Sequence, residues 1–281
     1  MIEKREVAMA KFQFGFIGCG NMGGALIKAI APKVGSENVC ITDRIAANTE
    51  QLHNCCHVSV LSSATEVAQE AKFIFLGVKP QGMGELLTEL SPILNAREDS
   101  YVLISMAAGI TVATIQEMVG IENVKVIRIL PNTPAAVGKG MTLYCANEHL
   151  LPNEEQQVIY ALEGAGKVDV LDERLIDAGC AVSGCGPAFV YLFMEAMADG
   201  AVASGLPRQK AMLYAAQTVL GAAEMLLASG SHPGELKDAV CSPGGSTIQG
   251  VNALEQGAFR GTVMQAVMAA FEKTKALGHT K

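Results

Sequence analysis

The sequence lacks an excess of basic residues. Its 21 Lys and Arg are outnumbered by 28 Asp and Glu, the formal net charge is −7 at pH 7, and no run of five like charges occurs. A nucleic-acid partner requires a basic face that neutralises its phosphates, so we expect none. With 50% hydrophobic and 17% charged residues, the chain has the balance of a protein with sizeable cores, and not that of a disordered segment.

Patterns for metal ions and disulfides are missing as well. The eight cysteines are scattered, only Cys55 and Cys56 are adjacent, and neither a CxxC nor a Cys/His cluster at ligand spacing occurs. We therefore expect no metal site. Thiols in apolar company, such as Cys40 and Cys180, suit a reducing compartment, so the sequence predicts a cytoplasmic protein.

Long apolar runs are also few. The longest charge-free apolar stretch is Ala178–Met194, and it is interrupted by Gly184, Gly186 and Pro187. At about 17 residues it is marginal for a membrane span, which needs about 20. We expect a buried helix at a subunit interface here, and no membrane partner.

Short apolar segments alternate with helix-like stretches in the first half of the chain. The strands that we expect are Phe12–Gly18, Val39–Thr42, Lys72–Val78, Tyr101–Ser105 and Val124–Ile129, with two further short ones at Met141–Cys145 and Lys167–Leu171. The expected helices between them include Met22–Ile30 and Val112–Met118. Strands separated by helices in this way form βαβ units, which predicts a parallel sheet.

The second half has no strand-like segment. Its stretches rich in Ala, Met, Leu and Gly predict helices at Leu175–Ser183, Gly186–Ala203, Arg208–Ser229 and, with breaks, Thr247–Leu277. Helices with small and apolar residues on several faces are rarely exposed to water all round. We therefore predict an all-α domain that buries one side against another subunit.

A glycine-rich turn joins the first strand to the first helix. Its G-x-G-x-x-G pattern lies within Ile17-Gly18-Cys19-Gly20-Asn21-Met22-Gly23. Gly18 permits the tight turn, Gly20 lets the backbone approach a pyrophosphate, and Gly23 allows close helix–strand packing, while the helix N-terminus attracts the anion. The sequence thus predicts an α/β fold with a Rossmann-type dinucleotide-binding domain over residues 12–171 and an all-α C-terminal dimerisation domain over residues 172–281.

Residues that follow later strands complete the predicted cofactor site. Asp43 lies 20 positions after Gly23, where a carboxylate bonds the adenosine ribose and favours NAD, unless it merely caps a turn. Arg44 can stack on adenine or pair with a 2′-phosphate, and the second role would favour NADP, so NADPH and NADH both stay open. Two further loops lie outside the carboxyl ends of strands, where open α/β sheets bind ligands. They are Gly77-Val78-Lys79-Pro80 and Met106-Ala107-Ala108.

Several segments together resemble pyrroline-5-carboxylate reductase. They are F-I-G-C-G-N-M-G from Phe16, V-K-P at Val78–Pro80, A-A-G-I-T at Ala107–Thr111, R-I-L-P-N-T-P at Arg128–Pro134, S-G-C-G-P-A-F at Ser183–Phe189, and the segment His232–Ile248, which ends in S-P-G-G-S-T-I. This last motif is the most specific. Cys185, Phe189 and Leu130 depart from the residues most common in that family.

The resemblance implies an enzyme that completes proline synthesis. It would use NADPH or NADH to reduce the C=N bond of a cyclic imino acid, Δ1-pyrroline-5-carboxylate. The resemblance also implies an intertwined homodimer, which in that family is often assembled further into rings of dimers. By the same likeness, Ile17 to Met22, Gly77 to Pro80 and Met106 to Ala108 would touch the cofactor. Ser242, Ser246 and Thr247 would surround the substrate.

The residues of the C-terminal motif suit this chemistry. Backbone N–H groups at a helix start, with the bend at Gly245 before them, form a carboxylate site. Thr247 is the catalytic candidate, because its hydroxyl can hydrogen-bond the ring nitrogen, and general acid assistance is worth ~10²–10⁴-fold. The alternative is an ordinary loop in which Ser246 or Thr247 caps the helix. His232 is interpreted as a turn residue.

Other functions fit the sequence less well. A hydroxyacid dehydrogenase needs a lysine soon after a glycine-rich segment early in the helical domain, and none follows Gly186 before Lys210. An acid-metal reductoisomerase requires clustered carboxylates, whereas Glu195 and Asp199 have no evident partners. A related cyclic-imine reductase and a non-catalytic NAD(P)H-binding sensor stay as alternatives.

Overall fold

The computed structural model describes residues 10–277. By compactness the chain forms two units, one that runs to Gly184 and takes up the chain again from Phe271, and one formed by Cys185–Ala270. We call them the N-terminal unit and the helical unit, and each is described by itself. The predicted domain boundary at residue 172 falls just before the helix that ends the first segment of the N-terminal unit.

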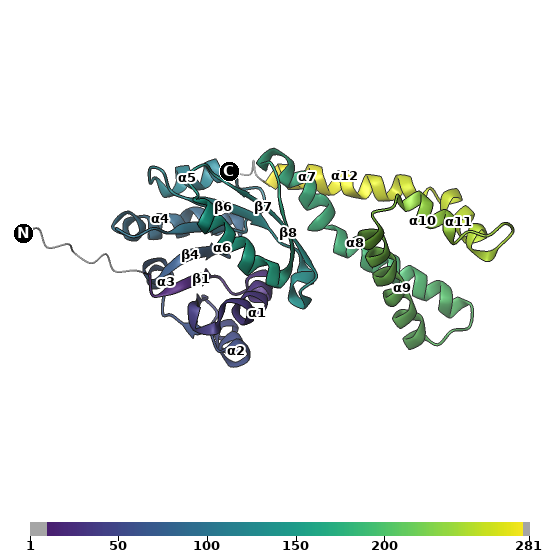
Figure 1. Ribbon diagram of the computed structural model, residues 1–281, viewed down its shortest axis with the longest axis horizontal. Coiled ribbons are helices and arrows are strands. Elements are labelled where there is room, and N and C mark those ends of the chain that lie inside the picture. The colour runs from purple at the N-terminus through teal and green to yellow at the C-terminus, as the bar shows by residue number, and fades with distance from the viewer. Residues whose placement is uncertain (1–9, 278–281) are drawn as a thin grey trace, which may run out of the picture. The chain divides into compact units, whose positions relative to one another are not determined.

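An eight-stranded sheet forms the centre of the N-terminal unit, with helices on both of its faces (Figure 1). The strand order is β3-β2-β1-β4-β5-β6-β7-β8. The strands are β1 Phe12–Ile17, β2 Val39–Thr42, β3 Ser59–Val60, β4 Ala71–Leu76, β5 Val102–Ser105, β6 Val126–Leu130, β7 Gly140–Ala146 and β8 Gly166–Val170. All the predicted strands are confirmed, with ends that shift by one or two residues. The two-residue edge strand β3 was not predicted, because it is too short to show a pattern.

The predicted parallel sheet is wrong at one pair of strands. β6 and β7 are antiparallel, with Arg128 opposite Cys145, whereas the other neighbouring strands are parallel. Only residues 131–139 join β6 to β7, and they hold the short 3-10 helix η3, Thr133–Val137. A parallel crossover needs a dozen or more residues, so this connection is too short and the chain turns back.

Helices cover both faces of the sheet and bury two apolar cores. The helices of this unit are α1 Asn21–Val34, α2 Ala46–Cys56, α3 Ala64–Glu70, α4 Met83–Asn95, α5 Val112–Val119, α6 Pro152–Leu162 and α7 Glu173–Ser183. One core packs α1, α2 and α6 against the sheet through residues such as Leu26 and Val158. The other packs α3, α4, α5 and α7 through residues such as Leu87 and Ile176. Burial on both faces accounts for the continuous apolar strands in the sequence.

The helical unit contains little core of its own. Its helices are α8 Gly186–Ala203, α9 Arg208–Ser229, α10 Pro233–Ala239, α11 Ser246–Gln256 and most of α12, Phe259–Leu277. The predicted α8 and α9 are confirmed to the residue, and the expected break after Thr247 falls at Gly257 and Ala258. Only Ala198, Ala211 and Ala215 form a buried cluster within Cys185–Ala270.

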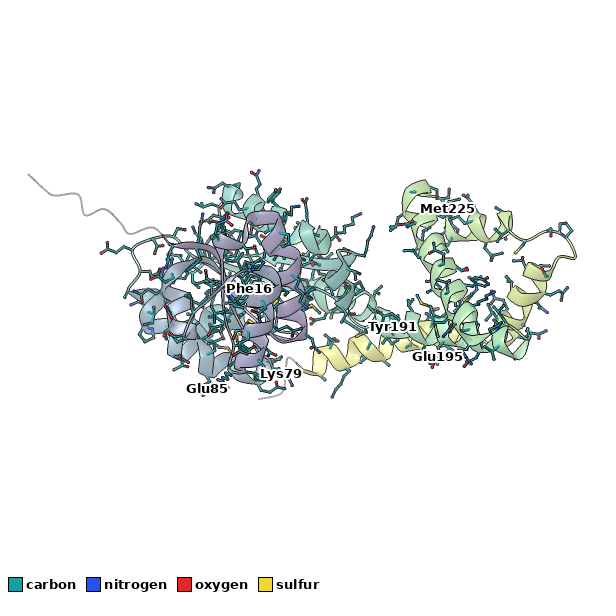
Figure 2. All side chains as sticks on the ribbon, turned by 90° about the horizontal axis from the view of Figure 1, so that it is seen from below. Phe16, Lys79, Glu85, Tyr191, Glu195 and Met225 are labelled. Carbon is teal, nitrogen blue, oxygen red and sulfur yellow. The ribbon has the colours of Figure 1, made fainter. Side chains whose placement is uncertain are left out.

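Large apolar side chains of the helical unit are exposed in the single chain. Leu192 is 68% exposed, Leu227 78% and Met264 65%, and Tyr191 and Met225 project outward in the same way (Figure 2). An apolar groove of about 720 Å³ runs between α8 and α12 and is lined by Phe193, Phe259 and their neighbours. Exposed apolar patches of this kind mark an interaction surface.

Two helical stretches have the length and hydropathy of a membrane span. They are Glu173–Ala203 and Arg208–Ser229, both at a mean hydropathy of 1.4 and mostly unburied within the described chain. A helix that is buried in a subunit interface has the same composition, so length and hydropathy alone do not distinguish the two cases.

Candidate functional site

Three of the predicted cofactor loops meet at the carboxyl edge of the sheet. The N–H of Gly77, after β4, donates to the carbonyl of Ile17 at the end of β1 over 2.7 Å. A Cβ atom added to Gly18 would lie 2.6 Å from the Gly77 carbonyl oxygen, and one added to Gly77 would lie 3.0 Å from Cε of Met106, after β5. Gly18 has φ +102°, which side chains rarely adopt. The loops after β1, β4 and β5 therefore touch, and glycine is required where they do.

The glycine turn presents free backbone donors to an open space. Gly20 is the N-cap of α1, and no side chain caps this helix. The first N–H groups of a helix have no intrahelical partner, and a Cβ on Gly20 would meet nothing within 4 Å. By contrast, a Cβ on Gly23 would collide with the carbonyl of Gly18. Open space above Gly20 and donors at Asn21 and Met22 fit a pyrophosphate group.

The side chain of Asp43 stabilises this turn through hydrogen bonds. Its carboxylate accepts hydrogen bonds from the N–H of Cys19 at 2.5 Å, the N–H of Ile45 at 2.8 Å and the side-chain amide of Asn48 at 3.2 Å. Burial and the nearby Asp43 charge raise the pKa of the Cys19 thiol to about 12, so Cys19 serves as a neutral packing residue. The turn-capping role that the sequence left open for Asp43 is present, and it uses both carboxylate oxygens.

Arg44 and Lys79 lie on the rim of the same edge. Both side chains are exposed, and Lys79 directly precedes the short 3-10 helix η2, Pro80–Gly82. Arg44 Nη2 lies 3.6 Å from Oε2 of Glu85 in the first turn of α4. Lys79 and Glu85 are both at the surface of the N-terminal unit (Figure 2). Deeper in the edge, Ala107 is buried, and its N–H donates to Ser105 Oγ at 3.2 Å.

The C-terminal motif forms a tight turn in the helical unit. The N–H of Gly245 donates to the carbonyl of Ser242 at 3.0 Å, and Gly244 has φ +70°. Proline followed by a glycine of positive φ is the pattern of a type II turn. A Cβ on Gly245 would lie 2.3 Å from Ser242 Oγ and 3.1 Å from the Ser242 carbonyl oxygen, so the serine hydroxyl packs directly against this glycine.

The alternative role as helix caps is wrong for Ser246 and Thr247. The N-cap of α11 is Gly245, which makes no side-chain cap, and the two hydroxyl residues occupy the first helical positions. Both are exposed. No residue within the described range 10–277 forms a hydrogen bond with either hydroxyl. The first turn of α11 therefore offers free N–H groups together with two free hydroxyls.

The predicted cofactor residues belong to the N-terminal unit and the predicted substrate residues to the helical unit. Contact between the two sets stays a prediction. His232 is the N-cap of α10, and its Nδ1 accepts from the N–H of Gly234 at 3.1 Å, in agreement with a turn residue. Asp199 pairs with Arg208 at 2.6 Å on the surface, and Glu195 is exposed on α8 (Figure 2).

Sequence reasoning missed two polar residues that fix α7 on the sheet. Arg128 on β6 is 1% exposed, and its guanidinium lies 2.7 Å from Asp177 and 3.3 Å from Glu173. Asn132, after the same strand, donates to the carbonyl of Ser183 at 2.8 Å and accepts from the N–H of Met141 at 2.9 Å. The available signal was an arginine inside an apolar strand, which is buried only when it has partners.

Comparisons with known proteins cover nearly the whole chain. Residues 173–277 match the family described as pyrroline-5-carboxylate reductase dimerisation, and residues 13–109 match the family described as NADP oxidoreductase, coenzyme F420-dependent. The chain is 41% identical to pyrroline-5-carboxylate reductase of Escherichia coli (strain K12), over 94% of this chain and 98% of that protein.

Two solved structures are similar over the same extent. The Plasmodium falciparum pyrroline carboxylate reductase with NADP bound is 35% identical with a TM-score of 0.83, and the alignment covers 96% of this chain and 100% of that one. The pyrroline-5-carboxylate reductase of Coxiella burnetii is 32% identical with a TM-score of 0.87 and the same coverage.

Proposed function

Since the chain belongs to the pyrroline-5-carboxylate reductase family, we propose that it transfers hydride from NADPH or NADH to the C=N bond of Δ1-pyrroline-5-carboxylate and releases L-proline. One observation carries this proposal beyond the likeness. Three glycine- and alanine-containing loops touch at Gly18 and Gly77, next to the open backbone of Gly20, while the first turn of α11 presents free donors. A dinucleotide fits the first feature, and a small carboxylate with a polar ring nitrogen fits the second.

The cofactor binds to the N-terminal half of the chain. Residues 12–171 form the dinucleotide-binding domain, in which Ile17 to Gly23 bind the pyrophosphate and Gly77 to Pro80 and Met106 to Ala108 line the nicotinamide side. NADPH is the preferred form, because the Asp43 carboxylate is already engaged by three protein donors, whereas the guanidinium of Arg44 is exposed. A guanidinium binds a 2′-phosphate through charge-assisted hydrogen bonds.

The substrate binds to the C-terminal half of the chain, residues 172–281. The carboxylate of the imino acid accepts from the N–H groups of Ser246 and Thr247 and from the hydroxyl of Ser242, with Gly245 keeping the approach open. The nicotinamide supplies the hydride, which goes to the imine carbon. As the C=N bond becomes a single bond, the ring nitrogen takes up the electron pair and the proton of the Thr247 hydroxyl, which water then reprotonates.

The active form in this proposal is a homodimer, which assembles further into a ring of dimers. The exposed apolar surfaces of α8, α9 and α12 support the dimer, since a monomer would leave them in water. The proposal includes a cytoplasmic location, with neither a membrane nor a nucleic acid as partner. It is supported by the net charge of −7 and by the interface that these helices would form.

Absorbance of reduced nicotinamide tests the reaction. Purified protein is mixed with NADPH or NADH and pyrroline-5-carboxylate, and a second cyclic imino acid with a six-membered ring is assayed in parallel. Oxidation of the cofactor with the five-membered ring, and L-proline as product, is expected. A faster rate with the larger ring would favour the related imine reductase, and no oxidation despite cofactor binding would favour the sensor.

Thr247→Ala tests the acid role. We expect kcat to fall by ~10²-fold with cofactor binding unchanged, while Thr88→Ala, a control on α4 whose hydroxyl bonds the Gly84 carbonyl, keeps the parental rate. A Thr247→Ala variant as fast as the parent would remove this residue from the mechanism.

A further inference from the structure

The Arg44–Glu85 pair crosses over the glycine turn. Arg44 follows β2, and Glu85 follows β4 in the first turn of α4. In the sheet these strands flank β1 on its two sides, and β1 itself runs into the turn at Gly18. Because Arg44 Nη2 and Glu85 Oε2 lie 3.6 Å apart, the two side chains bridge the edge of the sheet above the end of β1.

This bridge lies where the adenosine half of a dinucleotide is recognised. In doubly wound folds the ribose beside the second strand carries the 2′-hydroxyl or 2′-phosphate that distinguishes the cofactors. The Asp43 carboxylate next to it is engaged by three protein donors. Arg44 is thus the charged group of this segment that is free to change partner, and Glu85 is the group that holds it.

The bridge is weak enough to be exchanged. The two side chains are 81% and 77% exposed, and solvated pairs of this kind contribute up to about a fivefold change in an equilibrium. A phosphate offers the guanidinium stronger, bidentate hydrogen bonds than a carboxylate at 3.6 Å does. A 2′-phosphate would take Arg44 from Glu85, and the released Glu85 carboxylate would then lie near a second negative group.

We propose that Glu85 is a specificity-determining residue, which limits the preference for NADPH over NADH by competing with the 2′-phosphate for Arg44. This inference rests on the proposed function, since it requires a dinucleotide at the glycine turn. NADH lacks the 2′-phosphate and leaves the bridge in place, so Glu85 opposes the phosphorylated cofactor alone.

Binding titrations on the full-length protein test the proposal without turnover. The probes are NADPH and NADH, followed by nicotinamide fluorescence, and 2′,5′-ADP and ADP, followed by calorimetry, all at one ionic strength. Glu85→Gln should lower Kd for NADPH and 2′,5′-ADP by about threefold to tenfold, since both a competing ion pair and a repulsion are removed. Kd for NADH and ADP should stay within about twofold of the parental value.

Two further variants make the result specific. Arg44→Gln should weaken NADPH binding by at least about tenfold, because a charge-assisted pair to the phosphate is lost. In the Arg44→Gln background, Glu85→Gln should then improve NADPH binding less than in the parent, because only the repulsion between Glu85 and the phosphate is left to remove. Glu89→Gln, an exposed carboxylate one turn along α4, is the matched control and should leave every Kd unchanged.

The outcomes distinguish a failure of the role proposed for Glu85 from a failure of the proposed function. If Glu85→Gln leaves the affinity for NADPH unchanged, shifts NADPH and NADH alike, or acts equally in the Arg44→Gln background, the role of Glu85 is refuted while the reductase stands. If the folded parent binds neither NADPH nor NADH, the proposed function fails and the inference fails with it. Unchanged thermal midpoints in all four variants establish that the differences come from binding.

Discussion

The buried arginine of β6 allows a sharp test of how the N-terminal unit is held together. In Arg128→Met the charge disappears while an unbranched side chain keeps much of the volume. Two charge-assisted hydrogen bonds are lost, to Asp177 at 2.7 Å and to Glu173 at 3.3 Å, and each is worth about 1.5–3 kcal/mol. The partner carboxylates would be left next to the apolar core, although 27% and 32% exposed and therefore partly hydrated.

One contribution to the free energy of unfolding opposes this loss of stability. Arg128 Nε is buried and has no hydrogen-bond partner within residues 10–277, and a buried unsatisfied donor costs about 1–3 kcal/mol. Methionine removes that cost. We therefore expect a net loss of about 2–3 kcal/mol in the free energy of unfolding, and a fall in the thermal midpoint of about 5–10 °C for a unit of this size.

Urea denaturation measures the change in the free energy of unfolding, and hydrogen exchange shows which helix is destabilised. Amide protons of α7 should exchange faster in Arg128→Met, while those of α1, on the opposite face of the sheet, should keep their protection. Arg128→Lys is the matched control, since it keeps the positive charge and loses the two-pronged guanidinium group. The free energy of unfolding of this variant should lie between those of the parent and Arg128→Met. A methionine variant as stable as the parent, with α7 equally protected, would show that the ion pairs do not hold this helix.

Three other predictions follow from the same contacts. Gly18→Ala should abolish NADPH binding in a fluorescence titration. The φ of +102° at this position is one that side chains rarely adopt, and the new Cβ would lie 2.6 Å from the Gly77 carbonyl oxygen. Binding at the parental Kd would contradict the tight turn. Dilution should lower the thermal midpoint measured by circular dichroism, because the exposed apolar faces of the helical unit need a second chain; a midpoint independent of concentration would contradict the dimer. Burial raises the pKa of the Cys40 thiol from 9.0 to about 12, so the stability that a protonated thiol contributes is complete below pH 9 and is lost as pH rises from 9 towards 12. Mass spectrometry after alkylation at pH 8 should accordingly label exposed Cys55 before Cys40, and the reverse order would contradict the burial.

Features that depend on a few neighbouring residues could be predicted from the sequence alone. Apolar runs fixed the strands to within two residues, and helix-length stretches bounded by Gly, Pro and Ser located α8 and α9. The glycine turn was recognisable because a tight turn, an approach to phosphate and a close packing contact each demand glycine at a set spacing. The turn at Ser242 to Gly245 is local in the same way, since Pro243 and Gly244 determine its type.

Only the tertiary structure decided what residues far apart in the chain do to one another. Asp43 is engaged by a turn 24 positions away through Cys19, and Arg128 is paired 49 positions along the chain with Asp177. Such partners are selected by the packing of the sheet and its helices, in which each buried charge must find a specific counterpart, and no local pattern in the sequence encodes that choice.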